Sequence, residues 1–380
     1  MAITPEMIKE AEKLHLEALQ IVRDLCNIPA PSHHEEKRAE YCKNWFEKNG
    51  FSNVMIDDAL NVLAPVNLDL ASNDTFTVMM SHTDTVFPDM TPMPVIEKDG
   101  FIHSPGVCDD TANLSVLMVC AKYYKDHLPA DAEKILFVAN SCEEGLGNLK
   151  GSRKIMSDYG KRVEKFVSLD STCMHRIVCK AVGSHRYKVS VATEGGHSFG
   201  NFGNRNAIHI LASMIDLLYT IKVPKEGDST TTYNVGLISG GTSVNTIAQN
   251  AVMMYEYRSD NKECLAKMQN YFEHVIETFR ASGVKVEVEK VGDRPCADKI
   301  ADEDFDPLKN RYFASIKETL GMEGKERSGS TDCNIPLSMG IPAICFGVCR
   351  GAGAHTREEK LETASLLDGT KLFLDFLYRR

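Results

Sequence analysis

The feature that most constrains this chain is a series of short, continuously apolar segments that alternate with helical patterns. The segments predict strands at 76–80, 134–139, 165–169 and 343–346. Helical spacing of apolar residues predicts helices at 7–26, 36–49, 113–124 and 305–320. Strands that are apolar along their whole length must be covered on both faces. We therefore predict an α/β domain, a mixed sheet with helices on both faces.

Between residues 184 and 296 the pattern changes. Alternation of apolar and polar residues predicts strands at 185–192, 231–238, 251–257 and 284–289, and helical spacing predicts helices at 206–221 and 263–281. This β-α-β-β-α-β order is that of a ferredoxin-like α+β module. The sequence thus predicts one domain formed by residues 1–183 and 297–380, interrupted by an inserted α+β domain at 184–296.

Charge and apolar content exclude several classes of protein. With 43 basic and 53 acidic residues, the net charge of −10 disfavours a nucleic-acid partner, because phosphate contacts need a basic face. No apolar run approaches the roughly 18 residues that span a bilayer, and residues 1–20 lack the apolar core of a signal peptide. The 12 cysteines lack the spacing of zinc or redox motifs, so we expect reduced core thiols. These features predict a soluble, cytoplasmic protein that does not bind membranes.

Acidic residues and histidines recur at the ends of the predicted strands and beside one predicted helix. There are five such groups: His82-Thr-Asp84, Asp109-Asp110, Glu143-Glu144, Asp170 and His355. Each group alone is better explained as a helix cap, a solvated charge or a surface histidine. Because ligands of open α/β sheets bind outside the carboxyl ends of the strands, however, these distant groups are expected to converge. Their conjunction indicates a metal site.

The types of donor residue indicate the metal. Histidine and carboxylate ligands without thiolate suit zinc, or else manganese or cobalt. Five protein ligands are too many for one catalytic zinc, which usually has three and a water. They suit two ions about 3.5–4 Å apart that share a carboxylate and a water. The sequence therefore predicts two divalent ions, zinc foremost.

These motifs resemble those of the zinc-dependent exopeptidases and deacylases that include peptidase T, the aminoacylases, glutamate carboxypeptidase and acetylornithine deacetylase. The family's motifs H-x-D, Gly-rich D-D-K, E-E-G, a later Asp and G-x-H correspond in order to His82-Thr-Asp84, Gly106-Val-Cys-Asp109-Asp110, Glu143-Glu144-Gly145, Asp170 and Gly353-Ala-His355. The match runs along nearly the whole chain and implies that the inserted domain is a lid, through which some members dimerise. One departure is Thr111-Ala-Asn113, where the family has Lys or Gly.

The resemblance implies a role for each residue of the site. The implied ligands are His82 and Asp170 for one ion, Glu144 and His355 for the other, and Asp109 as the bridge between them. Glu143 would be the general base, taking a proton from the metal-bound water and passing it to the leaving amine. Asp84 would orient the imidazole of His82.

Four further residues match the family's substrate-binding positions. His197, in Gly195-Gly-His197-Ser198, resembles the lid histidine that stabilises the oxyanion. Asn245, Arg258 and Ser330 resemble positions that bind the substrate, and Arg258 could clamp a carboxylate. The structural alternatives are an exposed loop histidine, a turn asparagine, a strand arginine paired with an acid, and a Gly/Ser turn.

We therefore expect a di-metal amide hydrolase that cleaves short peptides or N-acyl amino acids, foremost an exopeptidase, with a homodimer through the lid as one possibility. One alternative is a serine hydrolase, because Gly196-His-Ser198-Phe-Gly200 matches G-x-S-x-G and is followed by Asp332 and His355. Residues 201–205 are, however, a poor helix start. The other alternative is a metal- or peptide-binding relative without turnover, which would have no use for Glu143 as a base.

Overall fold

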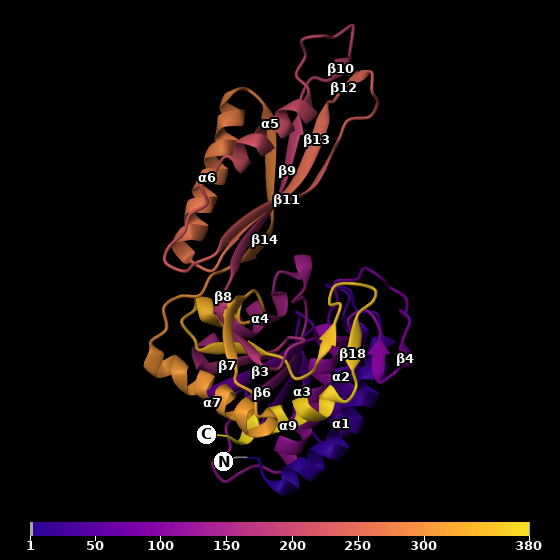
Figure 1. The fold of residues 1–380 in the computed structure, drawn as a ribbon, viewed down its shortest axis with the longest axis vertical. Coiled ribbons are helices and arrows are strands. Elements are labelled where there is room, and N and C mark those ends of the chain that lie inside the picture. Colours follow the sequence, from indigo (N-terminus) through magenta and orange to yellow (C-terminus); the bar gives the residue numbers. More distant parts are fainter. Residues whose placement is uncertain (1–2, 380) are drawn as a thin grey trace. The chain divides into compact units, whose positions relative to one another are not determined.

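The protein is represented by a computed structural model that describes residues 3–379 (Figure 1). Contacts within the chain divide it into two compact units. Unit 1 comprises Met1–Ala181 and Asp298–Arg380, and unit 2 comprises Val182–Ala297. The boundaries expected from the sequence differ from these by no more than two residues at either junction.

Unit 1 is built on a mixed sheet of eight strands, ordered β1-β2-β6-β3-β7-β16-β8-β15. The strands are β1 (Met55–Ile56), β2 (Val62–Val66), β3 (Phe76–His82), β6 (Ile135–Asn140), β7 (Val163–Leu169), β8 (Arg176–Ala181), β15 (Lys325–Gly329) and β16 (Ala343–Phe346). Strands β6, β3, β7 and β16 run parallel to one another, whereas β1, β2 and β6 pair antiparallel, as do β16 and β8. Every residue of β3 and β6 is buried, as expected for strands covered on both faces. The predicted α/β class with a mixed sheet is confirmed.

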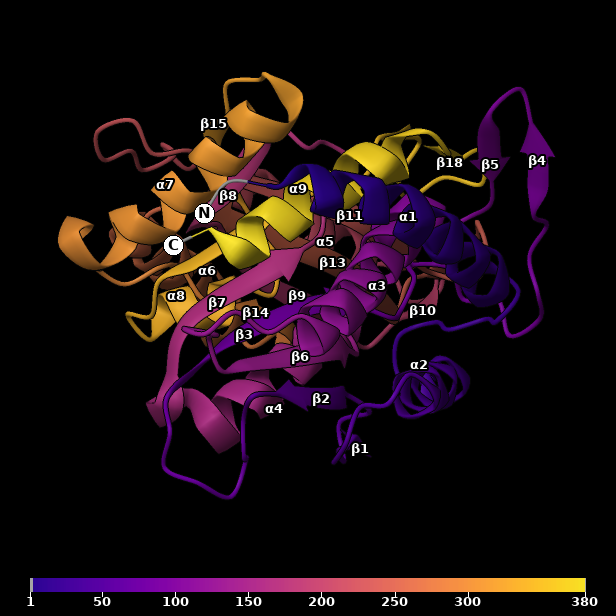
Figure 2. The same ribbon diagram turned by 90° about the horizontal axis from the view of Figure 1, so that it is seen from below.

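Four long helices pack together in unit 1 (Figure 2). They are α1 (Pro5–Cys26), α3 (Ala112–Asp126), α7 (Asp302–Leu320) and α9 (Ser365–Tyr378), and α3 lies against β3, β6 and β7. Helix α1 begins where it does because Thr4 accepts a hydrogen bond from the N–H of Met7 and Pro5 occupies the first helical position. Near the start of this helix Met7 is buried, whereas Ile8 is 36% exposed.

The remaining elements of unit 1 are smaller. Unit 1 also contains the helices α2 (Glu36–Lys48), α4 (Lys150–Tyr159) and α8 (Asn334–Ser338). A second sheet has the order β17-β18-β5-β4, formed by β4 (Ile96–Lys98), β5 (Phe101–His103), β17 (Gly351–Ala352) and β18 (Lys360–Glu362). This small sheet bears on function because the loop between β17 and β18 contains His355.

Unit 2 has the predicted β-α-β-β-α-β order around a four-stranded antiparallel sheet, β11-β13-β9-β14. Its elements are β9 (Gly183–Ala192), α5 (Ala207–Tyr219), β11 (Thr231–Gly240), β13 (Asn250–Ser259), α6 (Lys262–Ala281) and β14 (Lys285–Arg294). Side chains of β9, β13 and both helices form one apolar core that includes Val189, Met253 and Phe272. A short strand pair, β10 (Gly196–His197) and β12 (Thr246–Ile247), lies outside the sheet.

All 12 cysteines are free thiols, and only Cys173 and Cys179 are not fully buried. Their burial agrees with the expectation of core thiols rather than disulfides or zinc knuckles. Among residues 3–379, no helix has both the length and the apolar character needed to cross a bilayer.

Candidate metal centre

The five predicted metal ligands all lie in unit 1, at strand ends or in loops. His82 is the last residue of β3, Asp170 directly follows β7, and Glu144 lies in the loop after β6. Asp109 lies in the short segment Val107–Thr111 that precedes α3, and His355 lies between β17 and β18. Parallel neighbours β6, β3 and β7 therefore bring three of these residues to one edge of the sheet.

The donor atoms of these five residues form two groups that share Asp109. One group contains His82, Asp109 and Asp170, the other Asp109, Glu144 and His355, and the donor atoms of each lie within 4.8 Å of one another. Asp109 places Oδ1 3.1 Å from Nε2 of His82 and Oδ2 3.1 Å from Nε2 of His355. One carboxylate oxygen thus faces each imidazole, which is the arrangement that a ligand shared by two ions requires.

The carboxyl groups of the centre are crowded and buried. Burial, together with the charge of Asp109, raises the pKa of Asp170 well above its ordinary value, and burial raises the pKa of Glu144 to about 7. Burial would also raise the pKa of Asp109, but hydrogen bonds with His355 and His82 lower it. Several carboxylates that are ionised at one place need compensating positive charge, which divalent cations would supply. Two imidazoles and three carboxylates without thiolate therefore fit such cations.

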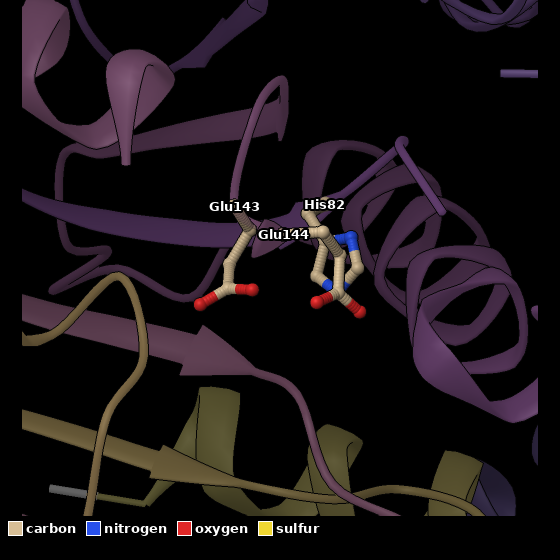
Figure 3. A group of neighbouring side chains, drawn as sticks. All are labelled: His82, Glu143 and Glu144. Atoms are coloured by element: carbon tan, nitrogen blue, oxygen red, sulfur yellow. The ribbon is translucent and has the colours of Figure 1, made fainter. Parts of the chain in front are cut away.

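Glu143 and Asp84 lie beside these ligands. Glu143 forms a third group of neighbouring donors with His82 and Glu144, and all three side chains point in one direction (Figure 3). Asp84 is fully buried and accepts hydrogen bonds from the backbone N–H groups of Glu143 and Glu144, both at 3.0 Å. Its Oδ1 also lies 3.3 Å from Nδ1 of His82. Asp84 therefore holds the backbone of both glutamates as well as one imidazole.

Two buried polar residues behind the ligands, Asp110 and Asn113, had no role assigned to them from the sequence. Asp110 accepts a hydrogen bond from the backbone N–H of His82 at 2.9 Å. Asn113 donates to Oδ1 of Asp110 at 2.7 Å and to the carbonyl of Ser171 at 3.2 Å, and accepts from the N–H of Val348 at 2.8 Å. Asn113, at the departure from the family pattern, thus joins three segments. No local pattern distinguishes Asn113 from the other polar residue of this helix start, Ser115.

Three of the predicted substrate-binding residues, His197, Asn245 and Arg258, belong to unit 2. Nδ1 of His197 accepts hydrogen bonds from the backbone N–H groups of Phe199 and Gly200, both at 3.3 Å. A neutral ring with Nδ1 as acceptor carries its proton on Nε2. The N–H of Ser198 donates to the carbonyl of Asn245 at 2.9 Å, which joins the two loops.

Arg258 and Ser330 lie in different surroundings from these two loops. Arg258, on β13, donates two hydrogen bonds to Glu256, from Nε and Nη2, each at 3.0 Å. Its guanidinium is thus engaged within unit 2. Ser330 follows β15 in unit 1 and is half-buried.

The arrangement that a serine hydrolase needs is not found among residues 3–379. Ser198 is followed by turns, and helix α5 begins only at Ala207. Asp332 is buried and accepts a hydrogen bond from Nδ2 of Asn140 at 2.6 Å. Nε2 of His355 instead faces Asp109 and Glu144, at 3.1 and 3.3 Å. The strand-turn-helix geometry of a nucleophile elbow is therefore missing.

Comparison with known proteins shows one family. The model of peptidase family M20/M25/M40 matches residues 78–379. The succinyl-diaminopimelate desuccinylase of Corynebacterium glutamicum is 24% identical over 367 residues, which are 94% of this chain and 95% of that protein. A tripeptidase from Staphylococcus aureus has a TM-score of 0.75 at 23% identity, covering 96% of this chain and 97% of its own. A dinuclear metal binding peptidase of the M20 family from Bacillus subtilis has a TM-score of 0.62 at 16% identity, covering 96% and 98%.

Proposed function

This chain belongs to peptidase family M20/M25/M40, and on that basis we propose that it is an exopeptidase that cleaves short peptides with the help of two zinc ions. Membership makes it a metallopeptidase-class amide hydrolase that acts on peptides or N-acyl amino acids. The proposal of two metal ions rests on the position of Asp109, whose two carboxylate oxygens face two imidazoles.

The ligands of the two ions follow from the two donor groups. His82, Asp109 and Asp170 would hold one ion, and Asp109, Glu144 and His355 the other. When bound, such ions polarise a carbonyl group and lower the pKa of a water molecule. Manganese and cobalt accept the same donors, so the metal is a matter for measurement.

Glu143 is the residue we assign as general base. It is 5% exposed, and its carboxyl group lies beside His82 and Glu144. A carboxylate there would take the proton of the attacking water and deliver it to the leaving amine. Because Asp84 binds the backbone N–H groups of both Glu143 and Glu144, it fixes the base relative to a ligand.

His197 is the residue we assign to the oxyanion. With Nδ1 accepting two backbone hydrogen bonds, its Nε2–H is a donor for the negative charge that develops on the carbonyl oxygen. Asn245, on the loop joined to that of His197, and Ser330 are proposed to contact the substrate backbone. For Arg258 to bind a substrate carboxylate, its two bonds to Glu256 must be exchanged for bonds to the substrate.

We further propose that the protein is a cytoplasmic homodimer. Strand β11 lies at the edge of the unit 2 sheet, and its Leu237 and Ile238 are 52% and 53% exposed. An edge strand with exposed apolar residues is a ready partner for another strand, here that of a second copy. Twelve free thiols favour a reducing compartment.

The test combines metal analysis with a substrate panel. We expect two metal ions per chain after reconstitution, and hydrolysis of dipeptides or tripeptides that a chelator abolishes. Preference for N-acyl amino acids would make the protein a deacylase instead. Two bound ions without hydrolysis of any member would favour a binding protein, and trace metal after reconstitution would overturn the proposal.

A further inference from the structure

A buried carboxyl group that the mechanism above does not use holds the segment containing Asp109. Glu359 lies four residues after His355 in the loop between β17 and β18, and it is completely buried. Its Oε2 accepts a hydrogen bond from the backbone N–H of Gly106 at 2.8 Å. Its Oε1 accepts from the N–H groups of Cys108 and Asp109 at 2.7 and 3.0 Å. One carboxylate thus binds three backbone groups at and just before Asp109.

The segment is shaped around this carboxylate. Several N–H groups that converge on one anion form a nest, and their bonds to a charged acceptor are roughly twice as strong as neutral ones. Gly106 has a φ of 75°, and a Cβ there would lie 2.6 Å from Cγ2 of Thr85. Only glycine fits that position without strain. Asp109 has a φ of −114° and a ψ of 85°, which lie outside the helical range. Glu359 therefore supports the conformation of this segment, beside the hydrogen bonds that Thr111 and Ala112 donate to the carbonyls of Gly106 and Val107.

We infer that Glu359 is a positioning residue for metal binding: it holds the backbone of Asp109 so that the Asp109 carboxylate stays between His82 and His355. The inference rests on the proposed function, because it concerns the ligand that both donor groups share. Since Glu359 and His355 belong to one short loop, Glu359 also ties the loop of the second imidazole to the segment of the shared carboxylate.

A role confined to holding the small sheet together does not account for these contacts. The pairing of β18 with β5 uses backbone groups, with Lys360 opposite His103 and Leu361 opposite Ile102. The carbonyl of Glu359 itself accepts from the N–H of Ser104 at 3.1 Å. These bonds persist without the carboxyl group, so its three bonds serve the segment of Asp109.

The test compares Glu359→Gln with Glu358→Gln, its exposed neighbour, in the full chain. Zinc alone is the probe, its affinity is measured by competition with a chelator, and circular dichroism confirms that each variant is folded. Loss of an outer partner of a metal ligand weakens binding about 10–100-fold, and we expect this for Glu359→Gln but not for Glu358→Gln. Saturating zinc should then restore most of kcat. Unchanged zinc affinity in Glu359→Gln would overturn the inference.

A second variant keeps the test decisive if Glu359→Gln does not fold. Glu359→Asp retains the charge but shortens the reach to the three N–H groups, so weaker zinc binding than in the wild type supports the inference, and equal binding overturns it. The wild type separates the two proposals. If it binds no zinc, the proposed function fails, whereas two ions bound equally by wild type and variants refute only the role of Glu359.

Discussion

The metal centre of unit 1 and the loops around His197 in unit 2 differ in burial and in how many hydrogen bonds hold them. At the metal centre, buried carboxyl groups of Asp84 and Glu359 accept backbone hydrogen bonds and leave the ligand segments little freedom. In the loop after His197, Phe199 and Phe202 are 90% and 91% exposed. Under the proposed function, the catalytic groups would therefore lie on segments held by hydrogen bonds, and the proposed substrate-binding residue His197 on an exposed loop.

The largest loss of activity should come from replacing Glu143, the proposed general base of the metal centre. Glu143→Gln keeps the size of the side chain but removes the proton acceptor, so we expect kcat to fall about 10²–10⁴-fold. Because Glu143 lies outside the two groups that share Asp109, both metal ions should remain. Steady-state kinetics and elemental analysis of one preparation measure both quantities. Activity near that of the wild type would show that the base is another group.

The second largest loss of activity should come from replacing His197, which lies in the exposed loop of unit 2. His197→Ala removes the proposed oxyanion donor, and we expect a loss of about 10²–10³ in kcat with metal content unchanged. His209→Ala, an exposed histidine of α5 in the same unit, is the control and should leave kcat intact. If His197→Ala lowered metal content instead, the separation between chemistry in one unit and recognition in the other would be wrong.

A smaller effect, on metal affinity, is expected from replacing Asp84, which forms hydrogen bonds to neighbouring residues of the metal centre. Asp84→Asn keeps the shape of the side chain but replaces one acceptor with an N–H₂ group facing the backbone N–H of Glu143 or Glu144. We expect metal affinity to fall about 10–100-fold in a chelator competition assay. Asp99→Asn, on an exposed turn, should bind metal as the wild type does. Equal affinities in the two variants would mean that the centre is less tightly fixed than its hydrogen bonds indicate.

The smallest effect concerns the pH dependence of stability. Burial, and then the nearby Glu143 carboxylate, raises the pKa of Asp332 to about 8. A carboxyl group with a raised pKa holds its proton more tightly when folded, so it contributes stability below its unfolded pKa of about 3.9, and this is lost as pH rises through about 8.

The melting temperature of the metal-free protein should therefore fall as pH rises from about 4 to about 8, and level off at higher pH. Asp332→Asn has no proton to lose and should flatten this profile, each kcal/mol corresponding to about 1 °C for a chain of 380 residues. Calorimetry of both proteins across this range measures the difference. Parallel profiles would show that the titrating group lies elsewhere.

Within unit 1, the strands that the sequence predicted are those whose apolar character is continuous. Predictions at 76–80, 134–139, 165–169 and 343–346 fall on β3, β6, β7 and β16. Strand β8 was not predicted, because only three of its six residues are buried and its partners lie far away in the chain. Pairing that depends on distant partners overrides local pattern.

The residues of the candidate site also divide into those that the sequence could predict and those that it could not. Its ligands could be expected from the rule that strand ends converge, whereas Glu359 and Asn113 could not. Glu359 binds backbone N–H groups about 250 positions earlier in the chain, and no local pattern encodes such a contact. A carboxyl group that binds main chain is indistinguishable in sequence from a solvated one.

The start of β9 and the end of β14 lie side by side, with Ser184 directly opposite Arg294. Adjacent strands are separated by only about 5 Å, so the polypeptide leaves unit 1 and returns to it at neighbouring points. A short linker between residues near 181 and 298 could therefore replace unit 2 without stretching the backbone of unit 1. Unit 2 is thus inserted between two neighbouring points of unit 1, and none of the candidate metal ligands belongs to it.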